Sequence, residues 1–411
     1  VQQFPKIKKQ IKEKPLVNIV HDSKEGWADA FVLGLKAWFD GRDVKFDYSM
    51  VRPAGARLEI AGGRASGPQP LMDLMEFVKR KILAKQGRRL SNLDMHDIIC
   101  QIGMIVVAGG VRRSALISIS ELEDTEMRDA KKGQFYLPEG QRAMANNSAV
   151  YNSKPSAEEF LNEWTALVKS KSGERGIFNR GGLEKQLPAR RWEAIKDERQ
   201  MGMNPCGEIY LRPKQFCNLT SIVIRPKDTI ETLKRKMELA TLLGTYQSTL
   251  TNFGYLSKKW KENCEAERLL GVSLTGYYDN PIVRDDQALD ILKADSIEVN
   301  KKYAKRFEIN ASTAITCVKP HGNSGQLLGV GSGMHPWFAP YFIRRVRISH
   351  TDTLLEMARD QGVPCLPEVG QSAESATTFV LEFPVKAPEG AIFKDEVSAL
   401  DLMKEWKRLK E

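Results

Sequence analysis

Long helical patterns alternate with short apolar runs along this chain, and this alternation restricts the possible folds more than any other feature of the sequence. Apolar residues recur at helical spacing in residues 22–39, in residues 71–87 and in residues 233–251. Ser91 and Asp94 have the spacing of a capping box, which predicts that another helix begins there. The short apolar, glycine-interrupted stretches between such segments are typical of strands and loops. Helices that alternate with strands indicate the α/β class.

Length and composition fit a large globular protein. The chain has 411 residues, of which 42% are hydrophobic and 28% are charged. It contains no run of about 18 apolar residues and no secretory signal, so we expect a cytoplasmic protein that contacts no membrane. Residues 1–21 are basic and poorly patterned, which predicts a linker or a frayed segment. Residues 22–411 show no convincing boundary and are expected to form one unit.

The charge balance is basic. The net charge is +10, from 62 lysines and arginines against 52 aspartates and glutamates. Such a balance suits anionic partners such as nucleotides and phosphates. Most of the excess lies in ordinary surface stretches near the two ends, "KIKKQIKEK" and "KEWKRLKE". No basic stripe is interleaved with aromatic residues, so nucleic acid is not an expected partner.

Six cysteines are spread along the chain without any CxxC pair: Cys100, Cys206, Cys217, Cys264, Cys317 and Cys365. Without a secretory signal, a structural disulfide framework is not expected. Structural zinc is usually held by closely spaced ligand pairs, so we predict no metal ligand. Most of these cysteines are expected to be buried small hydrophobes. Any two with a role in function are expected to be redox-active.

One short stretch, "NPCGE", brings a thiol and a carboxylate together. Asn204, Cys206 and Glu208 are offset by two residues, so an extended loop places them on one side. Pro205 favours an extended conformation at Asn204. Gly207 has no side chain, so a ligand can approach the backbone closely.

The carboxylate of Glu208 is a poor neighbour for a thiolate at Cys206, because a like charge raises the pKa of a thiol. A cysteine protease also needs a histidine beside its cysteine, and none is local. The stretch therefore suits a thiol used in its neutral form or as a radical, with the carboxylate as a separate base. A turn that contains a buried cysteine explains the same residues equally well.

Residues 319–326, "KPHGNSGQ", follow an expected strand and precede an apolar helix. Small residues at a helix start offer backbone N–H groups to a phosphate. The stretch is neither a Walker A loop nor a dinucleotide fingerprint. If the stretch is considered alone, it is better interpreted as an ordinary turn between a strand and a helix.

Several motifs now occur in one order: EGWADA, FDYSMVRPAGA, GGRASGP, VVAGGVRRSA, NNSAVY, GERGIFNR, NPCGEIYL with CNL, and KPHGNSGQLLGVGSGMHP with YFIRRVRIS. Together they closely resemble the catalytic subunit of ribonucleotide reductase over residues 22–384. EGWADA, FDYSMVRPAGA and VVAGGVRRSA look like the adenosylcobalamin-dependent (class II) branch rather than the metal-radical branch. The resemblance implies a ten-stranded α/β barrel with a central finger loop, of which residues 22–411 would be the catalytic barrel without its first and last strands.

The resemblance also implies roles for four residues. Cys206 matches the cysteine that becomes a thiyl radical and takes the 3′ hydrogen of the ribose. Glu208 matches the carboxylate that accepts the 3′-hydroxyl proton, and Asn204 matches the amide that binds the substrate hydroxyls. Cys217 matches one of the two cysteines that reduce the sugar and end as a disulfide. The cofactor implied is adenosylcobalamin, whose cobalt–carbon bond supplies the first radical.

Further matches concern substrate and effector. Pro320, His321, Gly322, Asn323 and Ser324 match the substrate-phosphate loop, although the family form resembles Pro-Ser-Gly-Thr and the side-chain contacts must therefore differ. Pro205 and Gly207, beside Cys206, are also implied to bind the substrate, as are Asn146, Asn147 and Ser148. The resemblance further implies a specificity loop, which consists of Gly109, Gly110, Val111, Arg112, Arg113 and Ser114. Ordinary surface arginine is the alternative for Arg112 and Arg113.

The expected activity is reduction of ribonucleoside di- or triphosphates to 2′-deoxyribonucleotides for DNA synthesis, with a deoxynucleoside triphosphate effector and a thioredoxin-like reductant. The family's second reducing cysteine and its C-terminal cysteine pair have no match here, and Cys100 does not fit the missing role. The chain is therefore expected to be incomplete at both ends, with a complementary N-terminal fragment as a possible partner. The alternatives are the large subunit of the metal-radical (class I) branch and a non-catalytic fragment.

Overall fold

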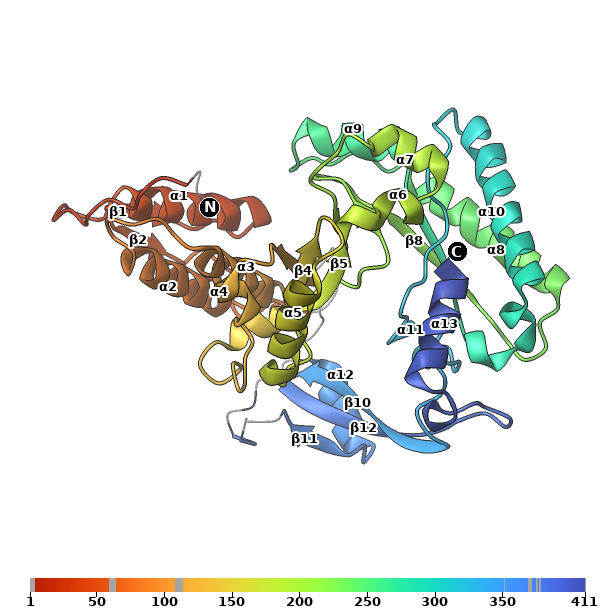
Figure 1. The fold of residues 1–411 in the computed structure, drawn as a ribbon. Helices are drawn as coiled ribbons and strands as arrows, with labels where there is room; N and C mark the ends of the chain where they lie inside the picture. Colours follow the sequence, from red (N-terminus) through yellow and green to blue (C-terminus); the bar gives the residue numbers. More distant parts are fainter. Residues whose placement is uncertain are drawn as a thin grey trace. The chain divides into compact units, whose positions relative to one another are not determined.

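The computed structural model describes residues 4–58, 64–107, 114–350, 352–368, 372–374, 376 and 378–410. The chain divides into two compact units, each of which is described by itself (Figure 1). Unit 1 comprises Val1–Val150, Pro155–Phe178 and Ile343–Phe383. Unit 2 comprises Tyr151–Lys154, Asn179–Phe342 and Pro384–Glu411.

The N-terminal part of unit 1 packs three helices with a short parallel sheet. The helices are α1 (Lys24–Phe39), α2 (Gln69–Leu83) and α3 (Asn92–Val107), and the strands are β1 (Leu16–Ile19) and β2 (Val44–Asp47). Each of the helices predicted there is confirmed. Two caps begin them: the Ser23 side chain accepts from Gly26 N–H, and Ser91 and Asp94 exchange hydrogen bonds as a capping box. Their apolar faces form a core that includes Trp38, Leu71, Leu74, Val78 and Ile98.

The segment predicted as a linker, residues 1–21, differs from that prediction where it is described. Ile7 is buried in the core of unit 1, and its backbone bonds with Gly87 and Arg88. β1 pairs with β2 along its whole length. Because an apolar side chain and a strand ladder hold this segment, it is part of unit 1 and not a free linker.

The rest of unit 1 is built on two small sheets. In the first, β3 (Leu116–Ser120), β4 (Ala145–Tyr151) and β5 (Gly176–Asn179) follow in that order, with β3 and β4 parallel. In the second, the order is β10 (Tyr341–Ser349), β12 (Thr378–Lys386) and β11 (Cys365–Pro367). The accompanying helices are α4 (Thr125–Arg128), η1 (Gly140–Met144), α5 (Ala157–Ser170) and α12 (Thr353–Asp360).

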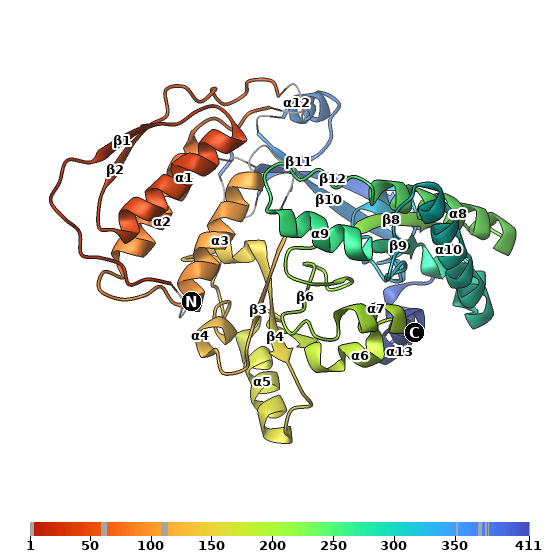
Figure 2. The same cartoon turned by 90° about the horizontal axis from the view of Figure 1, so that it is seen from above.

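Unit 2 centres on two parallel strands, β8 (Asn218–Val223) and β9 (Leu270–Thr275). Helices α8 (Ile230–Gln247) and α10 (Asp286–Arg306) lie side by side next to these strands, as Figures 1 and 2 show. The helix predicted over residues 233–251 is thus confirmed, about one turn earlier at each end. The remaining elements are η2 (Arg180–Gly182), α6 (Leu183–Gln186), α7 (Ala189–Ile195), β6 (Gly202–Met203), β7 (Tyr210–Leu211), α9 (Lys258–Glu267), η3 (Tyr277–Asp279), η4 (Pro281–Arg284), α11 (Ser324–Leu327), η5 (Lys394–Glu396) and α13 (Ala399–Lys410).

The two faces of β9 have different compositions. Leu270 and Val272 belong to a core that α8 and α10 complete with Leu233, Met237 and Leu292. Gly271, Ser273 and Thr275 alternate with them and therefore lie on the other face. A third segment runs along the other edge of β9. Leu270 and Val272 donate their N–H groups to Ala314 O and Ile315 O, at 3.0 and 2.8 Å, and Thr316 pairs with Val272 in parallel. The strand expected before residues 319–326 is thus reduced to one β-bridge, flanked by these backbone hydrogen bonds.

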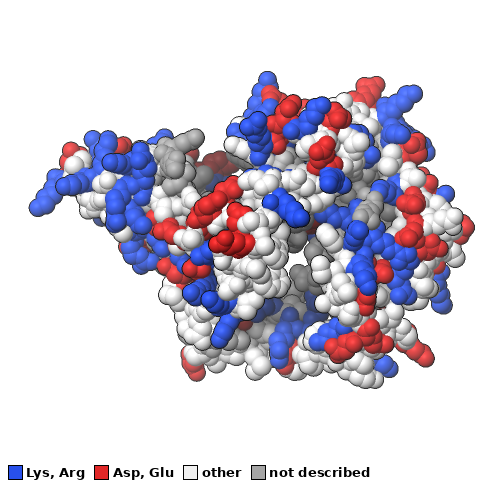
Figure 3. Space-filling model, in the orientation of Figure 1, with Lys and Arg blue, Asp and Glu red and all other residues white. Residues whose placement is uncertain are grey.

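The α/β class is confirmed. Among the described residues the strands form sheets of two or three, and closure into a ten-stranded barrel stays a prediction. On the face drawn in Figure 3, lysines and arginines are interspersed with aspartates and glutamates. Among the described helices, none has the length and apolar character that crossing a membrane would require.

Candidate active site

The stretch with Cys206 forms a tight hairpin in unit 2. β6 and β7 pair antiparallel, with Met203 opposite Tyr210. Asn204 closes the loop, because its N–H donates to Ile209 O at 3.0 Å and its Oδ1 accepts from Ile209 N–H at 3.0 Å. Gly207 has a φ of +79°, which favours glycine. The loop turns there, and Cys206 is exposed.

This geometry corrects the prediction of an extended segment with its polar side chains on one side. The positive φ of Gly207 reverses the chain between Cys206 and Glu208. The thiol of Cys206 is therefore exposed, while the side chain of Glu208 is 1% exposed. Asn204 uses its amide oxygen within the loop.

Glu208 is the most unusual group of the site. Both carboxylate oxygens are buried, and neither has a hydrogen-bond partner among the described residues. The Lys319 ammonium lies 3.8 Å from Oε1, which forms an ion pair but exceeds hydrogen-bond length. A buried charge without hydrogen bonds costs several kcal/mol in general terms. This carboxylate can therefore accept hydrogen bonds from a donor that the described residues do not provide.

Two thiols lie on the same face of the sheet. Cys217 directly precedes β8, and Cys317 directly follows the bridge residue Thr316. Both sulfur atoms are 3.2 Å from the point where a Cβ on Gly271 would stand. The glycine thus leaves the space into which both thiols point.

The surroundings keep both thiols protonated. Burial raises the pKa of Cys217 far above its ordinary value, and the charges of Cys317 and Glu208 add to the rise. Burial, followed by the charge of Glu208, raises the pKa of Cys317 to about 12. Protonated thiols are poor nucleophiles, but they suit donation of hydrogen.

Sequence reasoning missed Cys317. Cys317 lies at the end of the strand expected before residues 319–326, and the two-residue period of a strand puts it on the same face as Lys319. Lys319 directly precedes the predicted phosphate loop, so this alternation was the available signal. What the pattern lacked was the pairing partner of that strand, which decides which other thiol Cys317 faces.

The predicted phosphate loop lies next to these groups. His321 is buried at a φ of +53°. Its Nδ1 is 3.0 Å from Ser324 Oγ, and its Nε2 is 3.3 Å from Ser221 Oγ on β8. Burial, assisted by the charge of Lys319, lowers the pKa of His321 to about 4. The neutral imidazole thus joins the loop to the central sheet, while the space around Gly322 Cα is open.

A buried ion pair supports the hairpin from behind. Arg191 of α7 donates to Glu267 Oε2 at 2.9 Å and to Tyr210 O at 2.6 Å. Gln215 donates to the other oxygen of Glu267 at 2.9 Å. These bonds tie β7 and the segment before β8 to the end of α9, and so set the position of the loop between them.

The remaining predicted residues belong to unit 1 or fall outside the described residues. Asn146, Asn147 and Ser148 are on β4 in unit 1, where Asn147 N–H donates to Glu174 at 3.2 Å and the Asn147 Oδ1 atom is buried without a partner among the described residues. Gly109, Gly110, Val111, Arg112 and Arg113 fall outside the described residues, and Ser114 is the first described residue after them. No group of three or more histidine, cysteine, aspartate or glutamate side chains in the described part of the chain has the arrangement of a metal site.

Comparison with known proteins gives consistent results. No family model matches the chain. The adenosylcobalamin-dependent ribonucleoside-triphosphate reductase of Lacticaseibacillus paracasei is 30% identical over 403 residues, which cover 89% of this chain and 52% of that protein. The enzyme of the same name from Euglena gracilis is 28% identical and covers 90% and 50%. The chain thus spans about half the length of the curated relatives it matches.

A solved structure supports the same assignment. The crystal structure of a B12-dependent (class II) ribonucleotide reductase aligns with a TM-score of 0.70 at 26% identity, over 92% of this chain and 56% of that one. Sequence and fold agree over nearly the whole chain. Over about nine tenths of its length, the chain is similar in sequence and in fold to adenosylcobalamin-dependent, class II ribonucleotide reductases.

Proposed function

We propose that this chain carries the central catalytic residues of an enzyme that reduces ribonucleotides to 2′-deoxyribonucleotides by radical chemistry. The observation that carries the proposal is the set of groups around one hairpin: an exposed thiol at Cys206, a buried unpartnered carboxylate at Glu208, and the protonated thiol of Cys217. The names of the relatives point to a ribonucleoside triphosphate as substrate. They favour the cobalamin-dependent branch over the class I alternative.

Adenosylcobalamin is the proposed cofactor. The exposed thiol of Cys206 fits it, because a bulky cofactor needs open access to the atom that it oxidises. When bound, it supplies the first radical by homolysis of its cobalt–carbon bond. We assign no described residue to holding it.

The residues of the chain then divide the work. Cys206 takes the 3′ hydrogen atom of the ribose and later returns it. Glu208 accepts the 3′-hydroxyl proton, for which its two unpartnered oxygens are available. Asn204 binds the substrate hydroxyls. Cys217 supplies one of the two reducing thiols, and burial keeps its hydrogen in place until it is needed.

Substrate and effector binding are assigned to loops. Residues 320–324 bind the substrate phosphate, chiefly through backbone N–H groups, because the His321 ring is already engaged by Ser221 and Ser324. Asn146, Asn147 and Ser148 contact the nucleotide. The loop from Gly109 to Ser114 links a deoxynucleotide effector to the choice of base. A thioredoxin-like protein regenerates the thiols.

The proposal is tested by two substitutions in the enzyme that contains this chain. Cys206→Ser should abolish turnover, because the O–H bond of serine is stronger than the S–H bond of cysteine. The hydroxyl therefore cannot replace the thiol as the carrier of the radical. Glu208→Gln should lower kcat by at least 100-fold, because a general base contributes about 10²–10⁴ in rate. Formation of deoxynucleotide from each ribonucleoside triphosphate, with adenosylcobalamin and dithiol present, is the measurement.

Cys365→Ser is the matched control, since this cysteine lies on β11 in unit 1 and has no assigned role. It should keep turnover within twofold. Near-normal turnover of the Cys206 variant would refute the assignment. Circular dichroism and the midpoint of urea unfolding show whether each variant is folded.

A further inference from the structure

Cys317 has no role in the proposed reaction, yet its sulfur shares a space with that of Cys217. We propose that Cys217 and Cys317 form a dithiol that binds trivalent arsenic, either as arsenite or as an organic arsenical. The site is local to unit 2. The inference does not depend on the proposed function.

The distances permit one arsenic atom to join both sulfurs. Each sulfur is 3.2 Å from the same point, the Cβ position of Gly271, so the two are no more than twice that distance apart. If bonds from arsenic to sulfur are about as long as the ~2.3 Å bonds of zinc, a bridged pair lies within about 4.6 Å. Rotation of the two side chains about their Cα–Cβ bonds can bring the sulfur atoms from the first of these separations to the second. A side chain at position 271 would fill this space and would also meet Leu219 Cδ2 at 2.5 Å.

A direct disulfide between the two is excluded by the same topology. β8 pairs with one side of β9, through Asn218 and Leu270, and Thr316 pairs with the other side, at Val272. This register sets Cys217 beside residue 269 and Cys317 beside residue 273, so their Cα atoms are at least about two strand spacings, roughly 9.5 Å, apart. A disulfide requires Cα atoms within about 7 Å. A bridging atom is needed to connect the two sulfurs without moving a strand.

The protonated state of the two thiols determines which kind of ligand they can bind. Burial and neighbouring negative charge raise the pKa of both thiols, so ions that require two thiolates bind at a penalty. Arsenite reacts with neutral thiols: two S–H and two As–OH bonds break, two As–S bonds form, and two water molecules leave. No electron is transferred, and the net charge beside Glu208 does not change. The described residues also offer no third ligand for an ion with higher coordination.

The test uses phenylarsine oxide on the reduced, purified chain under anaerobic conditions, with intact-mass spectrometry as readout. We expect one adduct per chain that survives washing with a monothiol and is released by a 1,2-dithiol. Cys317→Ser, Cys317→Ala and Cys217→Ser should each lower retention at least tenfold. Because no cofactor or substrate is present, the result is independent of turnover.

Cys100→Ser and Cys365→Ser are the controls, and both should keep the adduct. Cys100 is the stricter of the two, because it is buried with a histidine nitrogen 3.6 Å away and therefore tests for a rival site. Full retention in the folded Cys317 variants would overturn the inference. Loss of the adduct in Cys206→Ser instead would overturn it as well, because the exposed thiol would then be the partner.

Discussion

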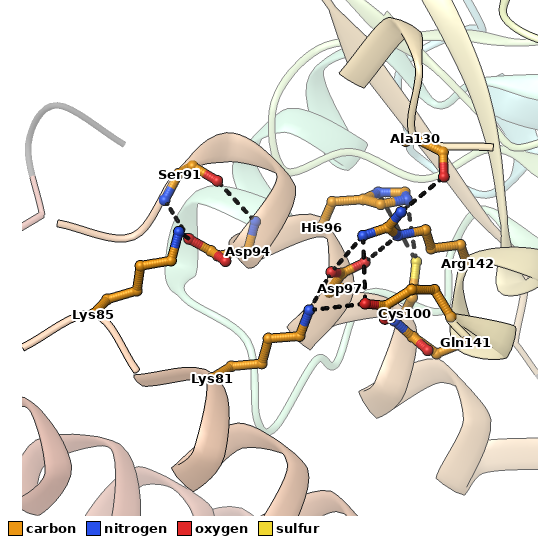
Figure 4. A network of polar contacts seen from close by, with 11 residues as sticks. Lys81, Lys85, Ser91, Asp94, His96, Asp97, Cys100, Ala130, Gln141 and Arg142 are labelled. Atoms are coloured by element: carbon orange, nitrogen blue, oxygen red, sulfur yellow. Dashed lines mark hydrogen bonds and ion pairs between the residues drawn. The ribbon is translucent and has the colours of Figure 1, made fainter. Parts of the chain in front are cut away.

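Two buried carboxylates, those of Asp97 and Glu208, differ in whether the fold supplies them with hydrogen-bond donors. In unit 1, Asp97 of α3 accepts from Arg142 Nε at 2.6 Å, from Arg142 Nη2 at 2.9 Å and from Lys81 Nζ at 2.7 Å, as Figure 4 shows. In unit 2, Glu208 has no hydrogen-bond partner among the described residues and one ammonium at 3.8 Å. The fold supplies hydrogen-bond donors to the carboxylate of Asp97, whereas the described residues supply none to that of Glu208.

The neighbouring thiols repeat the contrast. Cys100 lies against the ring of His96 on the next turn of α3, within the same polar network (Figure 4). Burial raises the pKa of Cys100 to about 12 and lowers that of His96 to about 4, so both are neutral. Cys217 and Cys317 are equally protonated, but they face a space that Gly271 leaves open.

Hydrogen-bond partners distinguish a carboxylate buried for stability from one buried for function. A carboxylate whose partners come from its own fold stabilises that fold, because each buried charge compensates another. A carboxylate buried without donors costs stability, and it persists where a ligand supplies the donors. The following predictions test whether Asp97 and Glu208 belong to these two classes.

The largest expected effect is on the paired carboxylate. Asp97→Asn should lower the free energy of unfolding by about 3–5 kcal/mol, because it leaves Arg142 and Lys81 as uncompensated buried charges. Urea unfolding followed by circular dichroism gives the value. Glu298→Gln, which breaks an exposed pair with Lys301, is the control and should cost less than about 0.5 kcal/mol. A loss below about 1 kcal/mol in Asp97→Asn would contradict the role of Asp97 in stabilising the fold.

The second prediction concerns pH. The pKa of His96 and of His321 falls to about 4 in the folded chain, with burial as the main cause. The unfolded chain binds these protons from about pH 6.5 downward, so stability is complete above that pH and falls toward pH 4. Each histidine contributes about 3 kcal/mol to this loss.

His96→Gln and His321→Gln separate the two contributions. Each variant should remove about half of the change in unfolding free energy between pH 7 and pH 4.5. The groups facing His96 are Asp97, Arg142 and Lys131, and Lys319 faces His321. Arg142 and Lys81 lower the pKa of Asp97 against the effect of burial, so its own titration falls below this window. An unchanged pH profile in both variants would contradict the neutral state of the rings.

The smallest effect is expected at the unpaired carboxylate. Glu208→Gln should leave the free energy of unfolding within about 1 kcal/mol of the original value or raise it, because a neutral amide is cheaper to bury than a lone carboxylate. The same urea series measures it beside Asp97→Asn. A loss comparable to that of Asp97→Asn would place Glu208 among the structural charges.

Much of the local structure could be predicted from the sequence. The helix α1, the capping box of Ser91 and Asp94, and the helix α8 were all indicated, because periodicity and caps act within a few residues. The turn at Gly207 was not, since the alternation of Asn204, Cys206 and Glu208 fits an extended segment as well. The predicted linker failed because Ile7 finds its partners near Arg88, far along the chain.

The order of residues was enough to predict the α/β class and the resemblance to class II ribonucleotide reductases, and it pointed to the loop with Cys206, Glu208 and the nearby Cys217. It did not show that Glu208 is buried without a donor among the described residues, or that Cys317 faces Cys217 across Gly271; both follow from the packing of the strands. The two kinds of property depend on interactions of different range. Caps and helical periodicity depend on neighbours in sequence, whereas burial and the approach of two thiols depend on which strands flank β9, and that pairing joins segments distant in the chain.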